Sequence, residues 1–251
     1  MANTFAPTGA NDFMHQGGSQ RTEELRQMWV ASSDATPIFN GDIVQMQVGY
    51  VSTGLQTGGF GAYITQGASG SSTGMIVGIF RGCELYNTAL QKMYFSRYFP
   101  GQSAAGTSSQ TGDIKAYVVA DRAQYFTIQV STDVVLGASN IGNLFNVGLS
   151  TAAGQLAAVG KSASAAGNTA TGNSGMCLIG TSGGTAISSQ TGLGAQSSFP
   201  FQLVDFYSNF GPGLLPGMIP GAGTGQFVNG MDNTTPAQVV IVRPWNWGQS
   251  L

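Results

Sequence analysis

The stretch Tyr125-Phe-Thr-Ile-Gln-Val130 decides the fold class, because large apolar side chains alternate along it with more polar ones. A period of two places the two kinds of side chain on opposite faces of a β-strand. Ile114-Lys-Ala-Tyr-Val-Val119 precedes it as a second strand candidate. Asp121 and Arg122 lie between the two stretches, where we expect a solvated turn. The sequence therefore predicts two successive strands joined by a short connection.

Further short apolar stretches recur along the chain, separated by glycine-rich turns such as Asn40-Gly41. No long stretch of helical periodicity interrupts them. Short strands at this spacing are typical of an antiparallel sandwich or barrel, so we predict an all-β fold. The other strand candidates are Ile43–Val48, Met75–Phe80, Met93–Phe99, Gly142–Val147, Met176–Ile179, Phe201–Tyr207 and Gln238–Val242.

Charge is scarce in this chain. Its 251 residues include 9 Lys and Arg and 11 Asp and Glu, which makes 8% charged residues and a formal net charge of −2. Soluble domains carry about 25% charged residues. Because there is no basic excess, we expect no direct binding to nucleic acid. A surface this neutral suits a protein whose outer faces lie against another molecule.

Targeting and membrane signals are not visible in the sequence. No apolar run reaches the roughly 18 residues of a membrane helix, and residues 1–20 lack the apolar segment of a secretory signal. We therefore expect no membrane partner and synthesis in a reducing cytoplasm. The two cysteines, Cys83 and Cys177, are far apart in the chain, and we expect both to be buried and reduced.

Residues 1–36 differ in texture from the rest and predict an N-terminal arm with a short helix. Leu25, Met28 and Trp29 follow the i, i+3, i+4 spacing of one helical face, and Thr22 is a candidate N-cap. Two interpretations remain open at this point: a helix that packs on its own domain, and an arm that docks on a neighbouring molecule.

Residues 37–251 are expected to form one β domain with two unusual segments. The first, 150–198, is rich in Gly, Ser and Ala and predicts long loops around one strand. The second, 211–225, alternates Pro and Gly with apolar residues and predicts an extended arm or structured loop, because proline cannot donate to a β-ladder.

Residue types that carry catalysis are sparse. The single histidine, His15, lies in the arm, so the nucleophile-elbow match Gly180-Thr-Ser-Gly-Gly184 has no later histidine to accept the serine proton. Gly154 and Gly160-Lys-Ser162 miss the spacing of a phosphate-binding loop by one residue. The acids are scattered beside turns, and no Cys and His cluster resembles a zinc site. We predict a protein that is not an enzyme, with no catalytic residues, cofactor or metal.

Aromatic residues gather in two places, Tyr94-Phe-Ser-Arg-Tyr-Phe99 and the pair Trp245 and Trp247. Core packing with an amphipathic rim is the favoured interpretation. Two functional alternatives stay open: an oligomer interface anchored by Trp and Tyr, and a platform on which sugars stack.

The chain contains an ordered series of short motifs, none of them specific alone. They are Gly41-Asp-Ile-Val44, Gly74-Met-Ile-Val-Gly-Ile-Phe-Arg-Gly-Cys83, Tyr94-Phe-Ser-Arg-Tyr-Phe-Pro-Gly101, Lys115-Ala-Tyr-Val-Val-Ala-Asp121, Phe126-Thr-Ile-Gln129, Thr171-Gly-Asn-Ser-Gly175 and Val239-Val-Ile-Val242. Together, over about residues 38–242, they resemble a family of decoration, or cement, proteins of tailed bacteriophages. The tail Arg243-Pro-Trp-Asn-Trp247 departs from that family's ending.

The resemblance implies a single jelly-roll-like β domain on the outer surface of a phage capsid, non-enzymatic and made in the bacterial host cytoplasm. The implied partners are the major capsid protein and a second copy of the chain, with a homodimer favoured over a homotrimer. A carbohydrate-binding spike or adhesin domain is the alternative function. The candidate interface residues are Arg21, Leu25, Met28, Trp29, Trp245 and Trp247.

Overall fold

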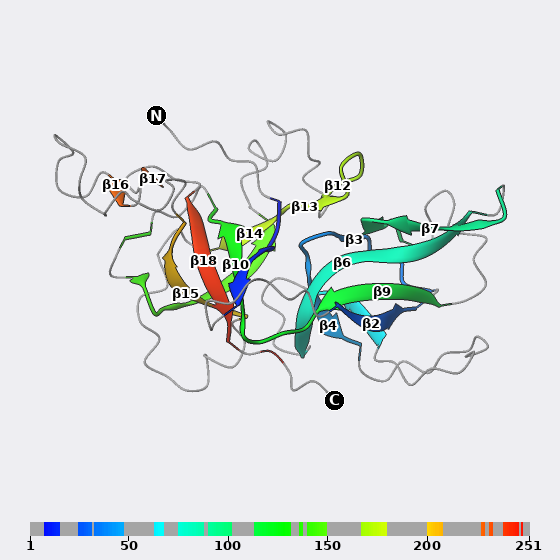
Figure 1. Cartoon of the computed structure of the whole chain (residues 1–251), viewed down its shortest axis with the longest axis horizontal. Coiled ribbons are helices and arrows are strands. Elements are labelled where there is room, and N and C mark those ends of the chain that lie inside the picture. Colours follow the sequence, from blue (N-terminus) through cyan, green and yellow to red (C-terminus); the bar gives the residue numbers. More distant parts are fainter. Residues whose placement is uncertain are drawn as a thin grey trace.

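The structure is a computed structural model that describes residues 8–15, 25–31, 33–47, 63–67, 75–87, 90–101, 113–131, 136–137, 140–149, 167–179, 200–207, 227–228, 231–232, 238–245 and 247. Within these ranges every regular element is a β-strand, which confirms the all-β prediction. Two six-stranded sheets lie side by side along the long axis of the molecule (Figure 1).

The first sheet closes into a barrel of five strands. Neighbouring strands follow the order β4-β5-β2-β9-β6, and a further pairing of β4 with β6 closes the ring. The β2–β5 pairing is parallel and the others are antiparallel. A sixth strand, β7 (Lys92–Ser96), pairs with the outer half of β6. The ring strands are β2 (Leu25–Val30), β4 (Ile43–Met46), β5 (Tyr63–Gln66), β6 (Ile76–Asn87) and β9 (Ile114–Val119).

The second sheet is antiparallel throughout and curls towards closure. Its order is β1-β10-β18-β15-β11-β14, and a bridge between Val130 and Leu178 brings β14 back to the end of β10. The strands are β1 (Asn11–His15), β10 (Gln124–Gln129), β11 (Leu144–Leu149), β14 (Met176–Ile179), β15 (Phe201–Phe206) and β18 (Val239–Pro244). Three two-stranded pairs complete the fold: β3 (Ile38–Phe39) with β8 (Tyr98–Phe99), β12 (Gly167–Asn168) with β13 (Asn173–Ser174), and β16 (Phe227–Val228) with β17 (Met231–Asp232).

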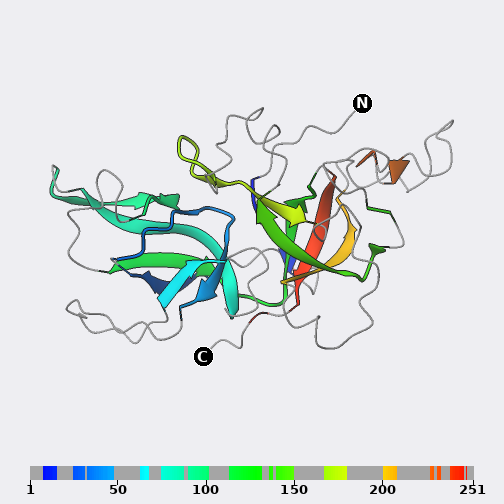
Figure 2. The ribbon, with the colours of Figure 1, turned by 180° about the vertical axis from the view of Figure 1, so that it is seen from behind.

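Strands β9 and β10 correspond to the predicted strands Ile114–Val119 and Tyr125–Val130, and they belong to different sheets. The connection between them turns at Asp121, whose carboxylate accepts a hydrogen bond of 2.8 Å from the Ala123 N–H. It carries the chain from the barrel into the second sheet (Figure 2). Along Tyr125–Val130 one face packs in the second core, whereas on the other face Tyr125 and Thr127 are half-buried and Gln129 is buried.

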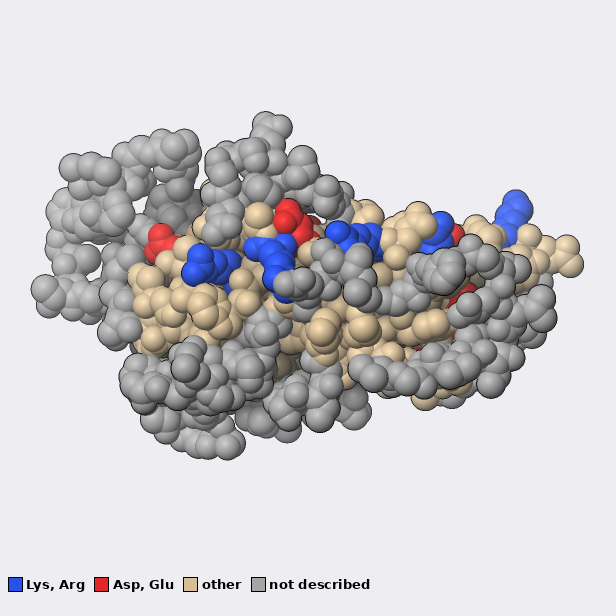
Figure 3. All heavy atoms as spheres, turned by 90° about the horizontal axis from the view of Figure 1, so that it is seen from below, with Lys and Arg blue, Asp and Glu red and all other residues tan. Residues whose placement is uncertain are grey.

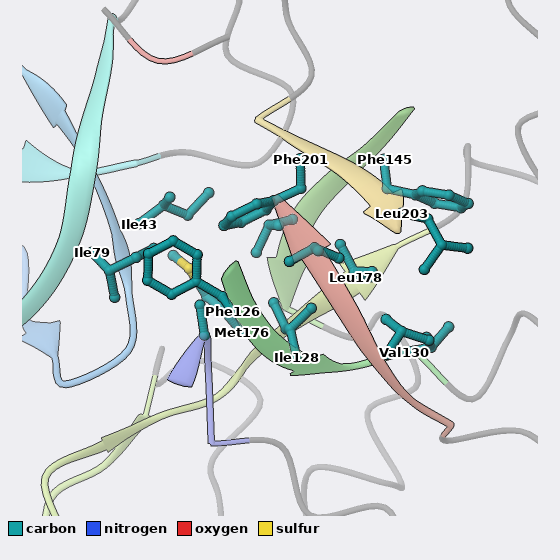
Figure 4. Packing of buried hydrophobic residues seen from close by; sticks show 14 of the residues in the cluster. Ile43, Ile79, Phe126, Ile128, Val130, Phe145, Met176, Leu178, Phe201 and Leu203 are labelled. Atoms are coloured by element: carbon teal, nitrogen blue, oxygen red, sulfur yellow. The ribbon is translucent and has the colours of Figure 1, made fainter. Parts of the chain in front are cut away.

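Two apolar cores hold the molecule together. The barrel interior is filled by residues such as Val30, Phe80 and Val118. The second core lies inside the second sheet around Phe126 and Phe201, and a fully buried Phe contributes about 1.5–3 kcal/mol. Three barrel residues also belong to this second core, namely Ile43, Ile79 and Val119 (Figure 4). The apolar contact between the two sheets is therefore continuous with the second core.

The predicted N-terminal helix is wrong, because Leu25–Val30 is strand β2 in the middle of the barrel sheet. Met28 and Val30 point into the barrel core, whereas Leu25 and Trp29 alternate with them. Leu25 and Trp29, four residues apart, share a face in a helix and in a strand, whereas Met28 shares that face only in a helix. Six residues make little more than one helical turn, which is too short for the spacing to decide between the two periods. Pairing with β9 on one side and β5 on the other selects the strand.

Other parts of the predicted organisation lie outside the described residues. These are residues 1–7 and 16–24 of the arm, the run 211–225, and most of the segment 150–198. The part of that segment that is described, from residue 167, contains β12, β13 and β14. Within 8–15, β1 pairs with β10 at the edge of the second sheet.

Candidate functional site

A buried carboxylate, that of Asp42, lies where three distant segments of the chain meet. Asp42 is fully buried, at the end of the turn that joins β3 to β4. Its Oδ2 accepts hydrogen bonds from the Phe39 N–H at 2.8 Å and from Gln66 Nε2 at 2.7 Å. Its Oδ1 accepts a hydrogen bond from the Ser174 hydroxyl. These donors replace the water that a buried carboxylate loses.

We call the meeting point of residues 8–10, 40–42 and 172–174 the Asp42 junction. The Ala10 N–H donates to the Gly41 carbonyl, and the Ser174 N–H donates to the Asn40 carbonyl, both at 2.9 Å. Gly9 and Gly41 have φ values of +74° and +95°, and a Cβ on Gly9 would lie 2.4 Å from the Gly41 oxygen. Only glycine fits such a close approach at positive φ.

An ion pair ties the N-terminal strand to the barrel beside this junction. Arg81 on β6 contacts the Asp12 carboxylate of β1 at 2.5 Å, and the side chains are 14% and 5% exposed. Its guanidinium also donates to the Ala10 carbonyl at 3.1 Å and to Asn40 Oδ1 at 3.3 Å. Arg81 and Asp12 are thus paired with each other, the Asp42 carboxylate accepts from neutral donors, and we assign the junction a structural role.

The barrel presents a second, chemically different feature: an outward face that the second sheet covers at one end only. Outward-pointing residues of β7, β6, β9 and β2 lie opposite one another in register. At the covered end, Val119 and Ile79 pack into the second core. Beyond them the face continues in the open. We call this open part the outer face; it consists of Leu25, Gln27, Trp29, Glu84, Tyr86, Met93, Phe95, Lys115 and Tyr117.

Polar groups at the centre of the outer face are paired with their neighbours. The Tyr117 hydroxyl donates to the Glu84 carboxylate, and this hydrogen bond, with some burial, raises the pKa of Tyr117. Lys115 lies 3.5 Å from Glu84 and 5.5 Å from the centre of the Tyr117 ring. The hydrogen bond with Tyr117 is the main reason that the pKa of Lys115 is raised. The Phe95 ring lies 5.9 Å from that of Tyr117 and extends the cluster towards β7.

Large apolar side chains are exposed where this face reaches the edge of the sheet. Met93 is 59% exposed and Phe95 is 57% exposed, and Leu90 in the preceding turn is 67% exposed. Tyr94, on the opposite side of β7, is 46% exposed. The β6–β7 hairpin projects at the end of the molecule away from the second sheet (Figure 1). Concentrated apolar exposure of this kind marks an interaction surface.

The predicted interface residues separate into two groups in the structure. Leu25 is 42% exposed and Trp29 is half-buried, both on the outer face, and Trp245 is 45% exposed beside Arg243. Met28 lies in the barrel core. Trp247, at 2% exposure, lies in the second core with its ring 5.5 Å from that of Phe126. The Met28 and Trp247 side chains therefore pack inside the molecule and do not form a surface with Leu25, Trp29 and Trp245. Arg21 is outside the described residues.

Sequence reasoning missed the exposure of the strand-edge aromatics. The core interpretation holds for Phe99, which is fully buried, but not for Tyr94 and Phe95. A bend at Arg97 separates β7 from β8, so the predicted single strand Met93–Phe99 is two strands with different surroundings. The Lys-Met-Tyr-Phe run lacks the alternation of a half-buried strand, and this is the signal that could have indicated exposure on both faces.

The remaining motifs do not assemble a reactive centre in the part of the chain that the structure describes. No group of three His, Cys, Asp or Glu there has the geometry of a metal site. The matches at 154–162 and 180–184 lie outside that part. Cys83 and Cys177 are both buried and form no disulfide, as predicted, and the Cys177 thiol donates to the Gly148 carbonyl at 3.5 Å. No described helix is long and apolar enough to cross a membrane.

On the face shown in Figure 3, Lys and Arg side chains lie mainly along one line parallel to the long axis, with Asp and Glu side chains near it. Uncharged residues make up most of the described surface on either side of that line. This distribution leaves broad neutral areas for contact with another surface.

No protein-family model, no curated protein and no solved structure matches the chain.

Proposed function

We propose that this chain is a non-enzymatic virion structural protein that binds the outer surface of a phage capsid and stabilises contacts between capsomers. The observation that carries the proposal is the outer face, on which exposed Leu25, Met93 and Phe95 flank half-buried Trp29 and Tyr117. In this proposal the major capsid protein covers the outer face, and the chain acts as a homodimer.

The spatial positions of the family-like motifs support the proposal. Gly41-Asp42, Phe80-Arg81-Gly82 and the turn ending at Ser174 are far apart in sequence. In the structure Asp42 bonds Ser174, and Arg81 bonds Asn40 next to Asp42. These motifs thus meet through hydrogen bonds in the β framework, which supports a structural role for them. A cement protein acts by binding, and a β framework holds its binding surface in one conformation.

The energetics of such a role follow from mass action. A ligand that binds only the assembled shell raises the stability of the shell by linkage. Aromatic and Met side chains are enriched in the cores of protein interfaces, and charged residues are depleted there. The outer face contains one Met and four aromatic side chains, and its two charged residues, Glu84 and Lys115, are paired with each other. Many copies on one shell add avidity when capsid subunits contact more than one copy at once.

Co-sedimentation with phage capsids that lack the decoration protein tests the proposal, read as copies bound per shell at saturation. We expect a saturating, symmetric copy number for the wild type. Leu25→Glu and Tyr86→Lys, at positions that are 42% and 38% exposed on this face, should lower occupancy at least tenfold while circular dichroism and melting remain close to wild type. Ile141→Glu is the matched control, because Ile141 is 44% exposed before β11 in the second sheet.

Equal occupancy for the wild type and both outer-face variants would overturn the assignment of this face. No binding of the wild type to intact shells would overturn the cement role itself. A glycan screen with the wild type and Trp245→Ala then examines the alternative, because Trp245 is the exposed member of the tryptophan pair.

A further inference from the structure

The edge of the barrel sheet is formed by β7, which pairs in the described part of the chain with β6 only. Alternate residues of an edge strand direct their N–H and C=O groups away from the sheet. Proteins usually protect such edges with charges, proline or bulges, because an open edge recruits another strand. In β7 the only charged residue is Lys92 at its start, followed by Met93, Tyr94 and Phe95.

We propose that β7 pairs antiparallel with β7 of a second copy, about a two-fold axis that passes through Tyr94. This inference rests on the homodimer of the proposed function and names the surface that forms it. A two-fold axis perpendicular to the sheet keeps each outer face on the same side of the joined sheets. Directly opposite residues of an antiparallel pair point to the same face of the sheet. Because faces alternate along a strand, the two-fold axis must lie at a residue position, so that each residue faces one an even number of positions away.

The register centred on Tyr94 uses the whole strand, residues 92–96. It places Met93 of one copy opposite Phe95 of the other, twice, on the outer face. Contacts between a thioether and an aromatic ring of this kind are favourable. On the opposite face the two Tyr94 side chains meet at the axis, and Lys92 lies opposite Ser96, so the two lysines are not opposed.

Centring the axis one residue earlier or later is less suitable. An axis at Met93 brings Leu90 and Gln91, which lie in the turn, into the ladder. An axis at Phe95 brings in Arg97, where the chain bends. Tyr94 is thus the centre that matches the length of β7.

Pairing through β7 makes one binding platform from two copies. The outer face of each barrel continues across β7 into that of the second copy, with Phe95 and Met93 at the seam. The Glu84–Lys115 pair remains inside each copy. Such a platform is two-fold symmetric, as a contact between two capsomers across a local two-fold axis requires.

Cysteine cross-linking of the full chain tests the register. Directly opposite Cα atoms in an antiparallel pair are about 4.5–5.5 Å apart, within the range of a disulfide. Tyr94→Cys alone should therefore give a covalent dimer on mild oxidation. Met93→Cys alone should not, since those positions would lie roughly 8 Å apart. A mixture of Met93→Cys and Phe95→Cys proteins should cross-link. The native cysteines are buried and do not compete.

Light scattering after size exclusion tests the interface itself. The wild type should have about twice the chain mass of 25.8 kDa. The double variant Met93→Lys, Phe95→Lys places lysines opposite each other and should be monomeric. The double variant Met93→Glu, Phe95→Lys opposes Glu to Lys twice and should dimerise. In both, the new lysine at 95 faces Glu84 of its own chain, so the folding contexts match.

A monomeric wild type, a dimer that neither double variant changes, or a dimer in which Tyr94→Cys fails to cross-link would each overturn the proposal. Capsid co-sedimentation of the same proteins is a separate readout. Saturating capsid binding by a monomeric wild type would reject the β7 dimer and leave the cement role in place. A β7 dimer without affinity for capsids would reject the cement role and leave the dimer.

Discussion

The Ser174 hydroxyl donates a hydrogen bond to the buried carboxylate of Asp42, although 132 positions separate the two residues in sequence. Asp42 immediately precedes β4 of the barrel, and Ser174 ends the small hairpin that leads into β14 of the second sheet. The bond therefore joins the two halves of the molecule at the point where the N-terminal strand also arrives. Stability of the whole fold should depend on this contact.

Asp42→Asn is expected to lower the free energy of unfolding by about 2–4 kcal/mol, because one of three donors would then face an amide N–H₂ in a buried site. Ser174→Ala should lower it by about 1–2 kcal/mol, since the other two donors remain. Urea denaturation measures both. Asp205→Asn is the control: Asp205 is exposed, and an amide oxygen can still accept the bond from the Phe206 N–H. Equal effects at Asp42 and Asp205 would contradict the junction's role.

The two ion pairs of the described structure should respond very differently to removal of the cation. Arg81→Met leaves the Asp12 carboxylate buried without its partner and is expected to cost about 3 kcal/mol. Lys115→Met removes a solvent-screened pair with Glu84 and should leave the free energy of unfolding close to the wild-type value. Hydrogen exchange should show faster opening of β1 in the Arg81 variant. Unchanged exchange in β1 would mean that the strand is held by its pairing with β10 alone.

The two C-terminal tryptophans provide a second matched comparison. Trp247 packs against Phe126 and Phe201, so Trp247→Ala should cost about 3–5 kcal/mol. Trp245 is exposed beside Arg243, so Trp245→Ala should change stability by less than about 0.5 kcal/mol. Thermal unfolding of the two variants measures the difference. A similar loss in both would contradict the assignment of Trp247 alone to the core.

Periodicity predicted most of the strands because most of them bury one face. Two predicted strands, Met176–Ile179 and Ile114–Val119, have the same bounds in the structure. The predicted strand Tyr125–Val130 is shifted by one residue from the observed strand Gln124–Gln129. Pairing could not be predicted in this way. The sequence places β9 next to β10, whereas their partners are β2 and β6 for one and β1 and β18 for the other.

The candidate surface was only partly visible from the sequence, for the same reason. Leu25 and Trp29 were selected as interface residues on a helical face, and they lie on the outer face as alternate residues of a strand. Phe95 belongs to the aromatic run for which an oligomer interface stays open from the sequence, whereas no sequence pattern points to Tyr117. The contact between the two rings depends on the register of β7, β6 and β9. Exposure of an aromatic run at a sheet edge is set by which strand ends the sheet, and that is a property of the tertiary fold.

The Cys83 thiol should make stability fall at high pH. Burial raises the pKa of Cys83 to about 12, and the neighbouring Glu84 carboxylate adds to the shift. In the unfolded chain the pKa of a cysteine thiol is about 8.5. Between these two pKa values the Cys83 thiol keeps its proton in the folded state and loses it in the unfolded state. The contribution of Cys83 to the free energy of unfolding is therefore complete below this pH window and is lost as the pH rises through it. Within the window the free energy of unfolding should fall by up to about 1.4 kcal/mol per pH unit.

The measurement compares Cys177→Ala with the double variant Cys83→Ala, Cys177→Ala, so that the two proteins differ at one thiol. Urea denaturation at pH 8, 9 and 10 should give a steeper loss of stability in the protein that retains Cys83. Iodoacetamide at pH 8 should leave Cys83 unlabelled in the native protein and label it in urea, because the thiolate is the reactive form. Parallel pH profiles, or labelling of the native protein, would show that the thiol ionises in the folded state at an ordinary pH.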